Sequence, residues 1–402
     1  MNILFLSDNF PPEVNAPATR TYEHCIRWVE QGVKVTVITC QPNFPKGKIY
    51  DGYKNRIYQK EVIDGITVIR VWSFIAPNSG FFKRILDFVS YAVMAFIVGL
   101  FQKCDLIIGT SPQFFTAVSA RMLSFLKWKP WVMEVRDLWP ESIAAVGALK
   151  KSSFSYKFLS RVERHLYLSA DTIIPVTNAF KNYMVGLGIN ENKIRVVTNG
   201  VERSKFMAGD KDIELLRELK LEEKFVIGYI GTHGMAHALN FIVETAKEIT
   251  DDRIHFVLQG DGSEKKKLQE RARELNLNNL TFLPFVAKDA IRRYISILDV
   301  ALVNLKKSDT FKTVIPSKIF ENASMLKPIL LGVEGESKEI ILKYNAGLCY
   351  EPENKESLKL AIKNISHSEI YKEFQLGCSE LANDYDRNNL ADEMLQVIKI
   401  LK

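Results

Sequence analysis

The chain has 402 residues, a length sufficient for two domains of ordinary size. With 47% hydrophobic and 25% charged residues its composition is globular, which excludes a disordered or collagen-like chain. The net charge of +7 suits an acidic small-molecule substrate or an anionic membrane surface. No long Lys/Arg run, zinc-finger spacing or recognition-helix signature occurs, so nucleic acid is not an expected partner. The five cysteines are scattered without a CxxC, so neither a disulfide framework nor a thiolate metal site is expected.

The N-terminal half predicts strands alternating with helices. Its opening apolar run, Ile3–Leu6, reads as a strand and not as a signal peptide, so we expect a cytoplasmic protein. A helix is expected at about Thr19–Gln31. Further strands are expected at Val33–Thr39, Ile66–Trp72, Asp105–Gly109, Trp131–Val135, Thr172–Val176 and Ile194–Val197. Short β-branched runs separated by helix-length segments are typical of a parallel sheet with helices on both faces.

The C-terminal half repeats this rhythm and ends in several helices from about Leu358. Its strands are expected at Phe225–Tyr229, His255–Gln259, Leu280–Leu283, Val300–Leu305, Pro328–Leu331 and Ala346–Tyr350. The Asn199-Gly200 turn signal places the domain boundary near residue 200. We therefore expect an α/β protein with Rossmann-like domains at residues 1–200 and 201–375, facing a central cleft. Helices in residues 376–402 are expected to pack back on the first domain. Functional residues should lie in loops at the carboxyl ends of strands.

A hydrophobic segment occupies Phe81–Phe101, with Lys83, Arg84 and Asp87 near its start. Three interpretations stay open: a buried core helix, a helix lying on the bilayer surface, and a true membrane span, for which it is short. The sequence KWKPW at 127–131 adds basic and aromatic residues of the kind found at lipid headgroups, or a solvated turn.

Two loops of the first half carry candidate site residues. In SDNFPPEVNAPATR, Asn15 and Ala16 precede a helix and would let a phosphate or sugar approach backbone amides, although a plain loop is the alternative. In EVRDLWPES, Arg136 could hold a phosphate, and Trp139 could stack on a sugar. Asp137 or Glu141 could accept a proton from an acceptor hydroxyl. An Arg136–Asp137 structural ion pair is the alternative.

Two loops of the second half suit a nucleotide diphosphate. In GYIGTHGMAHALN, Gly231 follows a strand and precedes a helix, while His233 and His237 suit polar neighbours of a pyrophosphate better than a zinc site. In IPSKIFENASMLKPIL, Lys318 stands in the first helical turn, where the dipole favours anions, so a bound phosphate would explain it. Glu321 lies on the same face and could accept hydrogen bonds from a ribose diol; a surface ion pair is the alternative.

At this motif the chain resembles the retaining glycosyltransferases of family 4, which have the GT-B fold. The resemblance runs from FLSDNFPPE through VRDLWPES, VTNGV and QGDGSEKKKL to PSKIFENASMLKPIL. It is nearest to bacterial surface-polysaccharide enzymes that act on sugars such as N-acetyl-L-fucosamine.

The resemblance implies specific contacts to a donor. Glu321 would hold the donor ribose, Ile315–Ser317 with Lys318 the phosphates, and Pro284–Val286 would frame the base. Gly231 would be the glycine after the first strand of the second domain. Asn15, Ala16, Arg20 and Trp139 are expected on the acceptor side. No cofactor and no metal are expected.

The chain departs from the family pattern at three places. Thr313 stands where the family has a second Glu, and Thr232 and His237 stand where it has basic residues. Arg136-Asp137 stands where it usually has a His. We expect Lys318 and His237 to supply the charge that these changes remove.

The resemblance implies a hexosyltransferase that moves a sugar with retention from a nucleotide-sugar, best matched by UDP-N-acetyl-L-fucosamine. The acceptor would be a polyprenyl-diphosphate-linked saccharide in O-antigen, lipopolysaccharide or capsule synthesis. The protein would associate peripherally with the inner face of the cell membrane. A nucleotide-sugar epimerase of the same fold and a non-catalytic scaffold are the alternatives, the latter favoured by Thr313 and Thr232.

Overall fold

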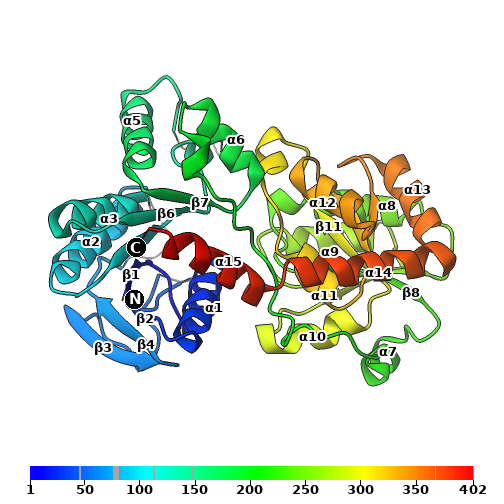
Figure 1. The fold of residues 1–402 in the computed structure, drawn as a ribbon. Coiled ribbons are helices and arrows are strands. Elements are labelled where there is room, and N and C mark those ends of the chain that lie inside the picture. The colour runs from blue at the N-terminus through cyan, green and yellow to red at the C-terminus, as the bar shows by residue number, and fades with distance from the viewer. Residues whose placement is uncertain (45–46, 76–80, 112–113, 146–148, 367, 402) are drawn as a thin grey trace. The chain divides into compact units, whose positions relative to one another are not determined.

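The fold is described from a computed structural model that covers residues 1–402 except 45–46, 76–80, 112–113, 146–148, 367 and 402 (Figure 1). The chain divides into two compact units. The first contains Met1–Thr198 and Arg387–Lys402, and the second contains Asn199–Asp386. Residue 376, where the sequence places the start of the last segment, lies inside a helix of the second unit, α14 (Ser368–Asp384).

The first unit is built on a seven-stranded sheet with strand order β3-β4-β2-β1-β5-β6-β7. Its strands are β1 (Asn2–Leu6), β2 (Lys34–Cys40), β3 (Tyr58–Ile63), β4 (Ile66–Val71), β5 (Leu106–Thr110), β6 (Trp131–Val135) and β7 (Thr172–Pro175). All neighbouring strands are parallel except β3 and β4. The predicted parallel sheet is therefore confirmed, with one antiparallel edge strand added.

Two strand predictions for this unit were wrong. Strand β3 was missed, although the Asp64-Gly65 pair that joins it to β4 has positive φ at both residues, as a tight hairpin turn requires. Residues 194–197 form no strand: Ile194 makes an isolated bridge to Ile173, and the Arg195 and Val197 N–H groups donate to the Ile173 and Pro175 carbonyls of β7.

Helices cover both faces of this sheet (Figure 1). They are α1 (Ala16–Glu30), α2 (Phe81–Leu100), α3 (Phe114–Lys127), α4 (Glu141–Ala145), α5 (Phe154–Ser169), α6 (Asn178–Gly186) and α15 (Arg387–Lys399). Leu4 and Leu6 of β1 face the layer of α2 and α3, whereas Ile3 and Phe5 face the layer of α1 and α15. This alternation is the two-residue period of a strand buried on both sides.

Helix α15 belongs to the first unit because it packs on α1. The indole N–H of Trp28 donates to the Ala391 carbonyl at 2.8 Å, and Arg27 pairs with Asp392 at 2.8 Å. The chain thus returns to the first unit through residues 387–402.

Helix α2 contains the hydrophobic segment and presents two different faces. Tyr91, Ala95 and Val98 are buried in the core, while Val93 and Ile97 are exposed on the other side. Among the described residues, none of the helices has the length and hydrophobicity that crossing a bilayer requires.

The second unit has a six-stranded, wholly parallel sheet with strand order β10-β9-β8-β11-β12-β13. Its strands are β8 (Phe225–Ile230), β9 (Ile254–Gln259), β10 (Leu280–Leu283), β11 (Val300–Asn304), β12 (Ile329–Gly332) and β13 (Gly347–Cys349). Its helices are α7 (Ile213–Leu219), α8 (Leu239–Ala246), α9 (Lys265–Glu274), α10 (Lys288–Ser296), α11 (Lys318–Ser324), α12 (Glu336–Tyr344), α13 (Lys355–Ile365) and α14. All six predicted strands of this half are confirmed.

Candidate functional site

Lys318, the first residue of α11, has an unusual environment. Its Nζ is buried and has no hydrogen-bond partner in the part of the chain that the structure describes. Burial lowers the Lys318 pKa to about 7, which the nearby Glu321 carboxylate partly opposes. A buried ammonium without partners is costly unless a ligand completes its contacts. Lys318 therefore marks the strongest candidate for anion binding in the second unit.

The loop after β8 lies against Lys318. A Cβ built on Gly231 would lie 2.6 Å from Lys318 Nζ, and Gly231 has a φ of +142°. The absence of a side chain at residue 231 thus gives the lysine its space. The sequence analysis singled out Gly231 for another reason, its place between a strand and a helix in a loop that suits a diphosphate.

Backbone packing fixes the same loop from the other side. The Gly231 N–H donates to the Gln259 carbonyl at 2.9 Å, and the His233 N–H donates to the Asp261 carbonyl at 2.8 Å. A Cβ on Gly260 would lie 1.9 Å from the Gly231 oxygen, so only glycine allows this approach. The QGDG sequence holds the two loops together.

His233 and His237 follow in the same loop. Burial lowers the pKa of both imidazoles to about 4. The charge of Lys265 contributes to this shift for His233, and the charge of Lys318 contributes for His237. Both rings are therefore neutral at physiological pH. No group of three or more His, Cys, Asp or Glu side chains suited to a metal ion occurs among the described residues.

Several groups around Lys318 are available to a ligand. The backbone N–H groups of Thr232, Gly234 and Ser317 make no hydrogen bond to any residue that the structure describes. The half-exposed Glu321 carboxylate likewise forms no hydrogen bond or ion pair there. Amide donors and an ammonium suit a diphosphate, and a free carboxylate suits hydroxyl donors.

The predicted base-binding segment follows β10. Pro284 is exposed, Val286 is half-buried, and the Pro284 carbonyl accepts a hydrogen bond from Gln259 Nε2 at 2.8 Å. Gln259 thereby ties this segment to the end of β9.

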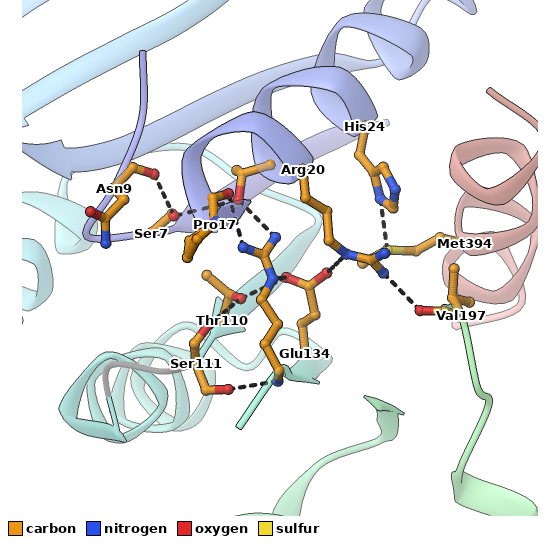
Figure 2. Close-up of polar contacts among 12 residues, drawn as sticks. Ser7, Asn9, Pro17, Arg20, His24, Thr110, Ser111, Glu134, Val197 and Met394 are labelled. Carbon is orange, nitrogen blue, oxygen red and sulfur yellow. Dashed lines mark hydrogen bonds and ion pairs between the residues drawn. The ribbon is translucent and has the colours of Figure 1, made fainter. Parts of the chain in front are cut away.

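In the first unit, Glu134 forms the centre of a buried charge network, shown in Figure 2. Its carboxylate is 2.8 Å from Arg20 Nε and 3.1 Å from Arg136 Nε, and it accepts the Thr110 hydroxyl at 2.6 Å. Burial alone would raise the Glu134 pKa, but the two guanidinium charges and the hydrogen bonds lower it to about 2. Sequence reasoning missed Glu134, although a strand places it on the same face as Arg136 two residues later.

The remaining guanidinium nitrogens of both arginines also contact protein groups. Arg136 donates to the Pro17 carbonyl at 2.8 Å and the Thr21 hydroxyl at 3.1 Å. Arg20 donates to the Val197 carbonyl at 2.9 Å. These contacts account for Arg20 and Arg136 without a ligand. The ion pair partner of Arg136 is Glu134, and the proposed Arg136–Asp137 pair does not form.

Asp137 and Glu141 differ in their surroundings. Burial raises the Asp137 pKa above its ordinary value, and the Ser142 hydroxyl donates to its carboxylate at 3.0 Å. Glu141 pairs with Lys151 at 2.6 Å and accepts the Tyr156 hydroxyl. Burial would raise its pKa too, but those two partners lower it. Asp137 is therefore the better suited of the two to accept a proton.

The other predicted acceptor-side residues have local roles in this structure. Asn15 caps α1, since its Oδ1 accepts the Ala18 N–H at 2.8 Å. Ala16 is exposed. The half-buried Trp139 ring stacks on Phe114 with 6.4 Å between centroids.

Comparison with known proteins relates the chain to glycosyltransferases. Residues 17–205 match the profile of Glycosyltransferase Family 4, and residues 211–388 match that of Glycosyl transferases group 1. The chain is 26% identical over 390 residues to the putative colanic acid biosynthesis glycosyl transferase WcaI of Escherichia coli K12, covering 93% of this chain and 95% of that protein. It is 25% identical to the probable glycosyltransferase WbjE of Pseudomonas aeruginosa, covering 65% of this chain and 66% of that protein.

Solved structures share its fold. Anabaena HepE in complex with UDP superposes with a TM-score of 0.75 and 15% identity, covering 99% of this chain and 100% of that one. Sucrose-phosphate synthase from Thermosynechococcus elongatus gives a TM-score of 0.77 at 13% identity, covering 100% and 98%. The predicted GT-B fold is confirmed, and the chain is a glycosyltransferase that joins a family 4 domain to a group 1 domain.

Proposed function

We propose that this glycosyltransferase moves a hexosyl group from a UDP-sugar to a polyprenyl-diphosphate-linked saccharide during synthesis of a surface polysaccharide such as O-antigen or capsule. The relative named for colanic acid biosynthesis supports a polysaccharide product. Structural neighbours bound to UDP and UDP-glucose support the nucleotide. N-acetyl-L-fucosamine is the sugar that the sequence resemblance favours.

The observation that carries the proposal is the buried ammonium of Lys318 beside Gly231, which has no hydrogen-bond partner among the described residues. A donor diphosphate would accept from Lys318 and from the amides of Thr232, Gly234 and Ser317. Glu321 would accept from the ribose hydroxyls. The exposed Pro284 and half-buried Val286 would lie against the base.

The chemical step would be helped mainly by electrostatic stabilisation of the leaving group. As the bond between the anomeric carbon and the diphosphate oxygen breaks, negative charge grows on that oxygen, close to Lys318. The acceptor oxygen forms its bond to the anomeric carbon on the same face, which retains the configuration. Its proton passes to Asp137 or to the departing diphosphate. Thr313, which stands where a second Glu is usual, would adapt the site to a different donor sugar.

Membrane association is proposed from the α2–α3 surface, which we define by Val93, Ile97, Phe101, Phe125 and Trp128. All five side chains are exposed, Phe101 by 81% and Trp128 by 88%. Helices α2 and α3 pack on each other; Val93, Ile97 and Phe125 lie in them, and Phe101 and Trp128 directly follow them. Lys127 and Lys129 flank Trp128 in the sequence and supply positive charge there, as anionic headgroups favour, while Lys83 and Arg84 lie at the start of α2. Peripheral binding at the inner face of the membrane would present a lipid-linked acceptor.

A donor screen tests the proposal. Purified protein would receive UDP-, GDP- and TDP-sugars with a short-chain polyprenyl-diphosphate-GlcNAc acceptor, and products would be weighed by mass spectrometry. We expect the mass of one added hexosyl residue with a UDP-sugar. No product with any donor, from protein that still binds UDP, would overturn the proposed acceptor. No product and no nucleotide binding would overturn the proposed donor site.

A further inference from the structure

Tyr229, near the end of β8, lies directly against the Lys318 ammonium. The Lys318 Nζ is 3.7 Å from the centroid of the Tyr229 ring. The ring is completely buried, and its hydroxyl donates to the Thr232 carbonyl at 2.8 Å. Sequence reasoning assigned Tyr229 to the strand and gave it no functional part.

The ring stabilises the lysine without using a conventional acceptor. An ammonium over an aromatic face is attracted by the ring quadrupole, and the attraction grows when water is excluded. Lys318 Nζ is buried and has no hydrogen-bond partner among the described residues, so the aromatic contact is its closest stabilising interaction there. An ammonium has three N–H donors, and here none of them is given to an oxygen of the described chain.

The geometry also fixes where the ammonium points. Gly231 leaves the space that the last atoms of Lys318 fill, with a Cβ on residue 231 falling 2.7 Å from Lys318 Cε. The Tyr229 ring also contacts the Lys318 ammonium. Its hydroxyl donates to the carbonyl of Thr232 and so anchors the loop that carries the Thr232 amide. The ring and the loop therefore fix the position of the Lys318 ammonium relative to the amide donors.

We propose that Tyr229 is a positioning residue for donor binding. Its ring face holds the Lys318 ammonium beside Gly231 and keeps the N–H donors available for diphosphate oxygens, while its hydroxyl fixes the Thr232 loop. This inference rests on the proposed function, because it assigns the diphosphate of a nucleotide donor to Lys318.

The proposal predicts a pH signature. The groups that face Lys318 are Glu321 on its own helix and the neutral His233 and His237 on the β8 loop, with Lys265 and Asp261 beyond His233. Only the charged form of Lys318 attracts a diphosphate, so affinity falls as pH rises through the lysine pKa. Removal of the ring lowers that pKa further, because the ring stabilises the charged form alone.

The first test is calorimetric titration with UDP between pH 6 and pH 8.5. Tyr229→Phe keeps the ring face and should bind within about threefold of wild type. Tyr229→Leu removes the ring face and should bind UDP about tenfold more weakly at pH 7. The midpoint, the pH about which UDP affinity falls as Lys318 loses its proton, should move to lower pH. Tyr371→Leu, which removes a half-buried ring of the same unit, is the control and should leave the midpoint unchanged. Wild-type affinity and midpoint in Tyr229→Leu would overturn the proposal.

A second test does not depend on a folded leucine variant. In wild-type protein with ¹³C-labelled lysine, the ε-methylene signal of Lys318 is identified by its loss in Lys318→Arg. Ring-current theory predicts an upfield shift for protons held over an aromatic face, and we expect this signal to be upfield and to titrate near neutral pH. A Lys318 signal at the random-coil position would overturn the proposal. An upfield signal in protein that binds no UDP would instead contradict the proposed function.

Discussion

A side chain at residue 231 would compete with Lys318 for space, because a Cβ on Gly231 would lie 2.6 Å from the lysine Nζ. Gly231→Ala also places an L-residue at a φ of +142°, so we expect a loss of stability of about 1–3 kcal/mol. Displacement of Lys318 should weaken UDP binding at least tenfold, measured by calorimetry on folded protein. Gly186→Ala is the control, because residue 186 has open space around it and should bind UDP normally. Unchanged UDP affinity in Gly231→Ala would contradict the predicted displacement.

Glu134 is predicted to be essential for the stability of the first unit. Glu134→Gln leaves two buried guanidinium groups without their carboxylate, which should cost about 3–5 kcal/mol in urea unfolding. Glu191→Gln, whose exposed carboxylate pairs with the half-buried Lys181, is the control and should change little.

The same carboxylate predicts a pH dependence. Its folded pKa of about 2 lies below the ordinary 4.5, so its stabilising effect is complete above about pH 4.5 and is lost as pH falls towards 2. The difference in unfolding free energy between wild type and Glu134→Gln should therefore shrink across that window. A constant difference would show that the Glu134 charge is not what stabilises the unit.

Asp137 is predicted to be the proton acceptor. Asp137→Asn should lower kcat by about 10²- to 10⁴-fold, while UDP affinity stays unchanged. Turnover should also fall in acid through a midpoint above 3.8, because burial raises the Asp137 pKa. Glu141→Gln, whose carboxylate is occupied by Lys151 and Tyr156, should have a smaller effect. Full turnover in Asp137→Asn would assign the proton to the departing diphosphate.

The α2–α3 surface is predicted to bind anionic membranes. Introducing charge with Ile97→Glu and Phe125→Glu together should abolish flotation with phosphatidylglycerol vesicles, because apolar insertion and attraction to headgroups are both lost. Val62→Glu, at an exposed position of β3, is the matched control. Equal flotation of both variants would place the membrane contact elsewhere.

Local sequence patterns were enough for most of the fold and for part of the site. Strand β6 matches its predicted bounds because Trp131–Val135 is a short, fully buried run that is apolar except at Glu134. Strand β3 was missed because its residues alternate between half-buried and exposed at a sheet edge. Lys318 and Glu321 were found because they share one short segment.

The contacts around these residues depend on distant parts of the chain. Tyr229 and Lys318 are 89 positions apart in the sequence, yet the structure brings their side chains together. Arg20 reaches Glu134 across 114 positions, so no local pattern could assign the arginine to a structural network.

The most direct test of the donor site is titration of Lys318→Met and Glu321→Gln with UDP. The matched controls are Lys338→Met and Glu339→Gln, at two exposed positions of α12. We expect wild type and both α12 variants to bind UDP alike. Lys318→Met and Glu321→Gln should bind at least tenfold more weakly while remaining folded. UDP binding by these two variants with wild-type affinity would contradict the proposed donor site.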